Sequence, residues 1–135
     1  MKTNKAVILG SNYFIALSIL RSLGPQKIHC VTFDHSKENT YASLSKYVSE
    51  KHITPHYANE PEAFLKYLIE YSKKQDVKPV LFPCADNYVE FIDKYLLELK
   101  DYYLIPQTEV GLYTKVMNKD TLAELALQYN APIPY

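Results

Sequence analysis

The sequence predicts an α/β fold in which a mainly parallel sheet of about five strands lies between two layers of helices. Short apolar runs alternate with segments of ten or more residues whose apolar side chains recur at helical spacing. Such alternation is typical of right-handed strand–helix–strand units and hence of parallel strands. The second apolar run has no strongly polar face, which indicates a sheet covered by helices on both sides.

The first strand and helix are the clearest elements of the chain. Residues 6–9 form an apolar run that ends at Gly10, and apolar residues beyond it recur at i, i+3, i+4 and i+7. Ser11 or Asn12 is expected to cap this helix by accepting a hydrogen bond from a backbone N–H. Gly24 is expected to end the helix, because glycine tolerates the left-handed conformation.

The second strand is predicted over residues 27–33, with Asp34 directly after it. An acidic residue at this position grips ribose hydroxyls in dinucleotide folds, but a loop or capping carboxylate is the favoured interpretation of Asp34. Residues 35–60 show the weakest pattern, and we expect a short helical turn and pieces of a short third strand there. His52 and His56 are interpreted as surface histidines, because the proline between them interrupts a helix.

The second half of the chain continues the alternation of helices and strands. A helix is predicted to open at Glu60, where Pro61 and Glu62 suit a first turn. Asp86 or Asn87 is the expected N-cap of the next helix, and Thr108 and Asn118 are the expected caps of the last two helical segments. The remaining predictions are strands at residues 79–84 and 102–105, a helix from residue 87 to 99, and a last helix that carries apolar residues from 122 to 129.

Composition excludes several classes of protein. The 135 residues include 15 basic and 15 acidic side chains with no basic cluster, which disfavours a nucleic-acid surface. No apolar run approaches the roughly 20 residues that cross a bilayer, and the amino terminus has no signal-peptide core. A cytoplasmic protein is therefore expected. The two cysteines, Cys30 and Cys84, are expected to be free and buried, and no metal site is predicted.

Polar residues follow three of the predicted strands. They are Gly10, Ser11 and Asn12 after the first strand, Asp34 after the second, and Asp86 and Asn87 after the strand that ends at residue 84. Ligands of parallel sheets bind beyond the carboxyl ends of the strands, and a helix N-terminus there suits an anion. Gly10, Ser11, Asn12, Asp86 and Asn87 are therefore the candidate substrate-binding residues. The same turn also serves as a plain connection, and Asp86 is as well placed to cap a helix as to hold an ammonium group.

Familiar nucleotide-binding motifs are absent from the sequence. Asn12 and Ile15 occupy positions where the dinucleotide fingerprint needs glycine, which leaves a dinucleotide-dependent reductase as a weak third hypothesis. The chain has no Walker loop and no nucleophile elbow. No complete active site can be recognised in these residues.

Three later motifs resemble the start of an ATP-grasp ligase. They are VLFPCAD at residues 80–86, MNKD followed by LAELA at residues 117–126, and NAPIP at residues 130–134. The SKYV segment at residues 45–48 is similar to a step in the carboxylate–amine ligase branch, which includes D-aspartate ligases. Asn130 stands where this family usually has glycine, and the sequence reaches Tyr135 before the expected threonine.

The resemblance implies a Rossmann-like, three-layer pre-ATP-grasp domain over residues 1–115. Residues 116–135 would be the first helix and the exit segment of a truncated ATP-grasp domain. The implied reaction turns a carboxylate into an acyl phosphate with ATP and Mg²⁺, and an amine then attacks it. Lys119 would reach the ATP phosphates, although a solvated first-turn lysine is the simpler alternative.

The resemblance also implies that the magnesium ligands and the grasping lobes lie further along the polypeptide. The chain is therefore expected to be inactive alone, with the C-terminal lobes as partners and a homodimer as a further possibility. The competing hypothesis is a stand-alone Rossmann-like module that binds a nucleotide or a small anion.

Overall fold

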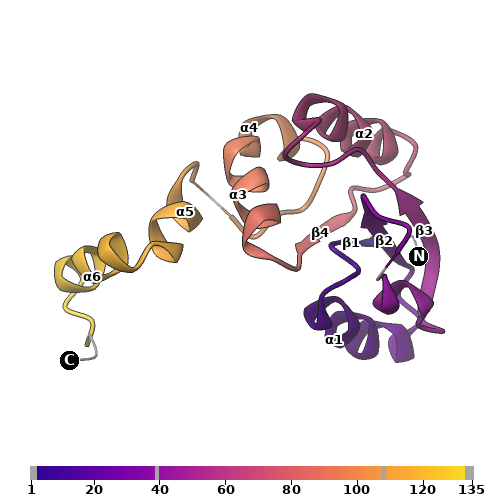
Figure 1. Cartoon of the computed structure of the whole chain (residues 1–135), viewed down its shortest axis with the longest axis horizontal. Helices are drawn as coiled ribbons and strands as arrows, with labels where there is room; N and C mark the ends of the chain where they lie inside the picture. Colours follow the sequence, from indigo (N-terminus) through magenta and orange to yellow (C-terminus); the bar gives the residue numbers. More distant parts are fainter. Residues whose placement is uncertain (1–2, 39, 108, 133–135) are drawn as a thin grey trace.

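The computed structural model describes residues 3–38, 40–107 and 109–132. Its centre is a four-stranded parallel sheet with the strand order β3-β2-β1-β4 (Figure 1). The strands are β1 (Ala6–Leu9), β2 (Cys30–Asp34), β3 (Val48–Ile53) and β4 (Val80–Pro83). β1 lies in the middle and pairs with both β2 and β4, in register over its whole length. The predicted α/β class is confirmed.

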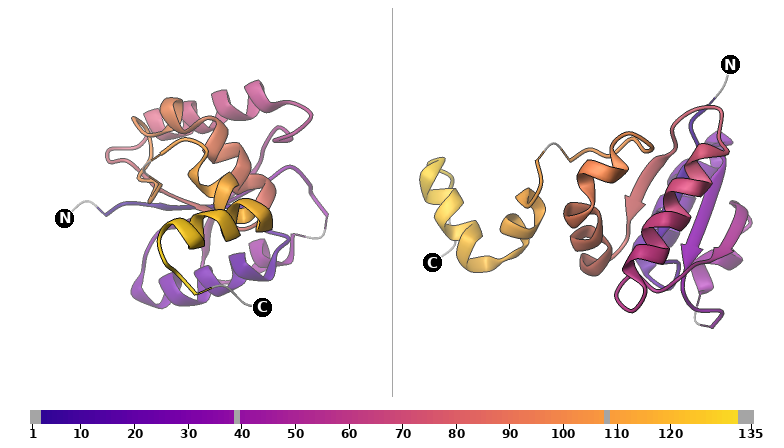
Figure 2. Two further views of the ribbon diagram at one scale, coloured as in Figure 1. Left: turned by 90° about the vertical axis from the view of Figure 1, so that its left-hand side faces the viewer. Right: turned by 90° about the horizontal axis from the view of Figure 1, so that it is seen from above.

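Helices cover both faces of the sheet and enclose two apolar cores (Figure 2). On one face lie α1 (Phe14–Leu23) and the short 3₁₀ helices η1 (Gly24–Gln26) and η2 (Tyr41–Leu44). On the other face lie α2 (Pro61–Lys73), α3 (Asp86–Lys94) and α4 (Leu96–Leu99). Alternate residues of β1 point to opposite sides, so that Ile8 joins the α1 core and Val7 joins the larger α2–α3–α4 core.

The last two helices form an arm that projects away from the sheet (Figures 1 and 2). The arm consists of α5 (Leu112–Met117) and α6 (Lys119–Gln128). α5 packs against α3, and α6 packs mainly against α5. Neither helix has a buried residue, so the apolar side of α6 is left largely exposed.

The predicted fifth strand is wrong. Within residues 102–105, only Leu104 forms a bridge, and its partner is Val80 at the free edge of β4. Tyr102 and Tyr103 are still turning out of α4, because their N–H groups donate to the carbonyl of Leu99. Pro106 follows and has no N–H with which to extend the hydrogen bonding between this segment and β4. The segment therefore pairs with the sheet at a single residue.

The predicted cap at the start of α1 is wrong, whereas the predicted end of the helix at Gly24 is confirmed. The residue before the helix is Tyr13, which makes no capping hydrogen bond, so neither Ser11 nor Asn12 is the cap. Gly24 follows the last residue of α1, but its φ of −60° is not the expected left-handed conformation. It begins η1, and Lys27 takes the left-handed conformation with a φ of 59°. Glycine is needed at residue 24 for space, because a Cβ there would lie 2.3 Å from the ring of Tyr47.

The other predicted caps have mixed outcomes. Ala85, rather than Asp86 or Asn87, precedes α3 and makes no side-chain cap. The predicted helix over residues 87–99 is divided into α3 and α4 at Tyr95. Asn118 does cap α6, and its side chain accepts from the N–H of Asp120 and Thr121. The predicted cap at Thr108 lies outside the described residues.

Candidate functional site

The carboxyl ends of β1, β2 and β4 lie along one edge of the sheet, which we call the rim. Backbone hydrogen bonds join these ends, since the N–H of Gly10 donates to Phe33 and the N–H of Cys84 donates to Leu9, each at 3.0 Å. The rim is therefore a continuous surface, and the predicted substrate residues follow the strands that form it. Cys84 also lies here, but burial raises the pKa of its thiol to about 12, so it acts as an apolar packing group.

Gly10 makes the turn at the end of β1 and has a φ of +93°. A Cβ at this position would meet the ring of Tyr88 at 2.9 Å and the ring of Tyr13 at 3.0 Å. Both the backbone conformation and the close approach of the two rings require a residue without a side chain. The rings line the turn, so the shape of the rim here depends on glycine.

Ser11 and Asp34 form a buried pair next to this turn. Ser11 is 1% exposed and Asp34 is 3% exposed. The Ser11 hydroxyl donates to Oδ2 of Asp34 at 3.0 Å, and the N–H of Ser36 donates to Oδ1 at 3.0 Å. Asp34 is the last residue of β2 rather than a loop residue, and its two carboxylate oxygens bond to the turns that follow β1 and β2. This supports a structural role for Asp34 over that of a ribose ligand.

The Ser11–Asp34 pair lines a cavity of about 250 Å³ on the η2 side of the rim. Besides Ser11, Asp34 and His52, its lining includes four side chains with hydroxyl groups and two with a positive charge. They belong to Thr32, Ser36, Thr40 and Ser43, and to Lys37 and Lys51. This lining suits a small anion.

Asp86 and Asn87 lie on the other side of the rim. Asp86 is exposed and lines a mainly apolar cavity of about 270 Å³ between α3 and α5. The Asn87 side chain accepts from the N–H of Tyr88 at 2.9 Å and donates to the hydroxyl of Tyr57, and it borders a third cavity of about 250 Å³. Ser11, Asp86 and Asn87 therefore share one edge of the sheet but line three different cavities.

Lys119 is the first residue of α6 and is exposed. It lies on the arm, and it lines none of the cavities described for the rim. The arm leads away from the sheet (Figure 1). A phosphate bound by Lys119 would therefore be held beside the arm and outside these three cavities.

The two predicted surface histidines are partly buried. His52 contacts the Tyr67 hydroxyl through Nδ1 at 2.7 Å and a carboxylate oxygen of Glu50 through Nε2 at 3.2 Å. Nδ1 of His56 accepts from two backbone N–H groups at 3.0 and 3.3 Å. Desolvation, and then the neighbouring His35, lower the pKa of His56. Among the described residues, no group of three or more His, Cys, Asp or Glu side chains is arranged to hold a metal ion.

Two partly or fully buried carboxylates were missed by sequence reasoning, Glu50 on β3 and Asp93 on α3. Glu50 accepts from Lys5 and His29 at 2.7 Å each and from Tyr71 at 3.1 Å. Desolvation alone would raise its pKa, but the hydrogen bonds from these residues and from His52 lower it to about 2. No local sequence pattern distinguishes either carboxylate from the exposed acids of the same elements.

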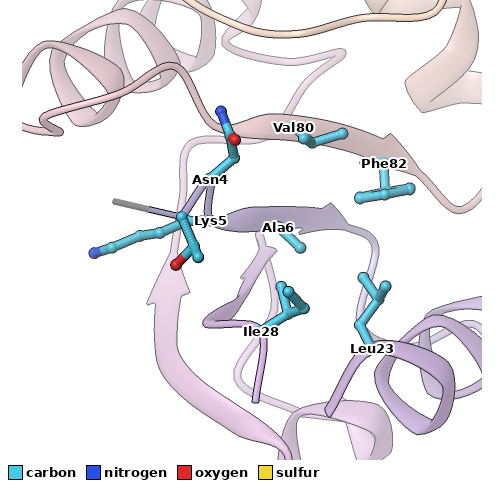
Figure 3. A pocket seen from close by; sticks show the side chains of 8 residues that line it. Asn4, Lys5, Ala6, Leu23, Ile28, Val80 and Phe82 are labelled. Atoms are coloured by element: carbon cyan, nitrogen blue, oxygen red, sulfur yellow. The ribbon is translucent and has the colours of Figure 1, made fainter. Parts of the chain in front are cut away.

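A further cavity of about 330 Å³ opens at the opposite edge of the sheet (Figure 3). Its lining is mainly apolar and comes from the amino ends of the strands, with Ala6, Val80 and Phe82 on the sheet and Leu23 and Ile28 beneath it. Ligands of parallel sheets bind at the carboxyl ends, so this cavity is not the candidate site.

In the described part of the chain, no helix is both long enough and apolar enough to cross a membrane.

No family model matches the sequence. A curated relative, a D-aspartate ligase of Enterococcus faecium (strain Aus0004), is 27% identical over 85 residues. The match covers 61% of this chain and 20% of the relative. The resemblance to the N-terminal domain of ATP-grasp carboxylate–amine ligases is confirmed. The chain spans about a fifth of the length of this relative.

Two solved structures share the fold over 98% of the chain. One is the biotin carboxylase domain dimer of the Hydrogenobacter thermophilus 2-oxoglutarate carboxylase, solved with MgADP, ADP and bicarbonate, with a TM-score of 0.64 and 14% identity. The other is a complete pyruvate carboxylase from Rhizobium etli, with a TM-score of 0.57 and 18% identity. The chain covers 29% and 13% of these two proteins, so each match is a small part of a larger protein.

Proposed function

We propose that this chain is the substrate-side domain of an ATP-dependent carboxylate–amine ligase. The observation that carries the proposal is the D-aspartate ligase relative, which belongs to the branch that the sequence motifs resemble. In the proposed reaction, ATP phosphorylates a carboxylate to an acyl phosphate and ADP leaves. An amine then attacks the acyl carbon, phosphate leaves, and an amide bond forms.

The rim supplies groups that suit the two substrates of such a reaction. In the turn after β1, the backbone N–H groups of Ser11 and Asn12 would bind a carboxylate. The N–H of Gly10 is already bonded to the carbonyl of Phe33, and the Ser11 hydroxyl to Asp34. Asp86 is exposed at the mouth of its cavity and would hold an ammonium group. Asn87 would act by orienting Tyr57, because its amide donates to that hydroxyl.

The remaining lobes of the ligase are the proposed partner of the arm. Leu122, Leu127 and Tyr129 on or beside α6 are 44%, 64% and 74% exposed. Apolar side chains exposed in this way favour a covering element. The Mg²⁺ ligands are proposed to lie on the same lobes, and Lys119 at the start of α6 would reach the ATP phosphates from the arm. We propose that the 135-residue chain alone forms no stable complex with ATP.

The test of Lys119 uses the full-length enzyme and the variant Lys119→Ala. Loss of a charge-assisted contact to phosphate costs about 1.5–3 kcal/mol, so the KM for ATP should rise roughly tenfold or more. Steady-state kinetics with varied ATP would measure this change. Lys115→Ala is the matched control, because Lys115 is an exposed lysine on the neighbouring helix α5. Equal ATP kinetics in both variants would remove Lys119 from the site.

The cavity at Ser11 and Asp34, with Lys37 and Lys51 in its lining, favours the alternative, a stand-alone module that binds a small anion. Calorimetric titration of the 135-residue chain with ATP and with inorganic phosphate separates the two proposals. Saturable binding of either by the chain alone would favour the module. A ligase domain that needs its other lobes should show neither.

A further inference from the structure

Asp93 is a buried carboxylate whose hydrogen-bond partners come from a different part of the chain. It lies on α3 and is 2% exposed, whereas Glu90, one turn earlier, is exposed. Among the described residues, its hydrogen-bond donors are uncharged. A carboxylate is costly to bury, and it is stable here only if strong donors satisfy both oxygens.

Those donors lie on the segment that leads into the arm and on α5, its first helix. Oδ1 accepts from the N–H of Gly111 at 2.9 Å and from the side-chain amide of Gln107. Oδ2 accepts from the Thr114 hydroxyl at 2.5 Å and from the Thr114 N–H at 3.3 Å. Gly111 directly precedes α5 and has a φ of +81°. Four donors therefore converge on two oxygens of one side chain.

The direction of the arm depends on this contact. α6 packs mainly on α5, so α6 can only point where α5 points. The other contact between α5 and the domain is apolar, and it brings Tyr113 and Met117 to the cavity beside Val89 and Ile92. Apolar contact is non-directional, whereas hydrogen bonds weaken steeply away from their preferred angle.

We propose that Asp93 is a positioning residue: its carboxylate latches the start of α5 onto α3 and so fixes the direction in which the arm leaves the domain. The latch is a property of the 135-residue chain and does not need the ligase function. Its consequence for ATP, through the placement of Lys119, rests on the proposed function.

Distances between two spin labels would test the latch in the 135-residue chain. One label would be attached at Ser22→Cys, near the end of α1, and the other at Glu124→Cys, on α6. Both positions are exposed, and the distance between the two labels measures where the arm lies relative to the domain. The native thiols of Cys30 and Cys84 are 0% and 1% exposed, so the chain without added cysteines serves as the unlabelled blank. Electron–electron double resonance should give a single, narrow distribution of distances between the labels when the chain carries no other substitution.

Asp93→Asn is the principal variant. Its amide offers N–H groups where the donors of Thr114 or Gly111 need an acceptor, so the distance distribution should shift and broaden. Glu90→Gln is the matched control and should leave the distribution narrow, because Glu90 is an exposed acid on the same helix. A narrow, unshifted distribution in Asp93→Asn would overturn the proposal.

A second pair of variants keeps the test decisive if Asp93→Asn does not fold. Thr114→Val removes the hydroxyl donor at nearly constant volume and should broaden the distribution. Thr114→Ser keeps the donor and should not. Equally narrow distributions in both would show that apolar packing alone sets the direction of the arm, which contradicts the latch.

The KM for ATP of the full-length Asp93→Asn enzyme separates the latch from the proposed function. A changed label distance with unchanged ATP kinetics would support the latch and contradict the role of Lys119. An unchanged distance would contradict the latch whatever the ATP kinetics.

Discussion

At the scale of single residues, Gly10 shows how a turn can depend on two separate requirements. Its φ of +93° is a conformation that residues with a side chain rarely adopt. The rings of Tyr88 and Tyr13 add a second requirement, because they occupy the space that a Cβ would need. Gly111, with a φ of +81°, has the first requirement without the second, since a Cβ added there would have no neighbour within 4 Å among the described residues.

The comparison of Gly10→Ala with Gly111→Ala separates these two requirements. The left-handed backbone should cost either variant about 1–2 kcal/mol in free energy of unfolding. Gly10→Ala should cost more, because the new methyl group also displaces aromatic rings that are packed into the rim. Urea denaturation of the two variants and the unchanged chain would measure the difference. Equal losses would mean that the rings move aside freely.

At the scale of elements, the sequence predicted what local pattern determines. β1, α2 and the cap of α6 follow from an apolar run, a helical stripe and an asparagine before a first turn. The cap of α1 was predicted wrongly because a distant contact overrides the local pattern, and the fifth strand because the turn that leaves α4 extends into it. Ser11 turns toward Asp34 instead of capping α1, and residues 102–103 remain bonded to α4.

Asn118→Ala should destabilise α6 locally rather than the whole domain. The variant removes the oxygen that accepts from the N–H of Asp120 at 2.9 Å, a loss of about 0.5–2 kcal/mol for a helix cap. Because α6 has no buried residue, amide hydrogen exchange should accelerate over Lys119–Gln128 and stay unchanged in β1. Asn118→Asp keeps the acceptor and is the control. Faster exchange in β1 as well would show that the arm supports the sheet.

At the scale of the whole molecule, the edge that carries the candidate site was predictable, but the division of that edge into separate cavities was not. Parallel strands bring their carboxyl ends together whatever the loops do. The cavities depend on loops that fold back over long distances. The N–H of Ala42 donates to Ser11, and Asn87 bonds to Tyr57, and neither pairing leaves a signal in the local sequence.

Glu50 joins elements across the molecule, and its contribution to stability should depend on pH. Its pKa is lowered from 4.5 to about 2 in the folded protein, so below about pH 4.5 the unfolded chain binds more protons at this site. The stabilisation from Glu50 is therefore present above about pH 4.5 and is lost as the pH falls toward about 2.

The variant Glu50→Gln should lack this part of the acid dependence. Free energies of unfolding measured across this pH range should fall less steeply with decreasing pH in Glu50→Gln than in the unchanged chain. Glu70→Gln is the control, because the Glu70 side chain is 57% exposed and its pair with Lys66 is on the surface. Identical slopes for Glu50→Gln and the unchanged chain would contradict the role given to Glu50.

The prolines around β4 have a consequence for solubility. β4 is an edge strand, and within the described residues its outer side is bridged only by Leu104. Exposed strand edges recruit other chains through unpaired N–H groups and lead to aggregation. Pro79 precedes β4, Pro83 ends it, and Pro106 follows the bridge. Since proline carries no N–H, these positions offer an incoming strand no donors, and the sheet resists growth at this edge.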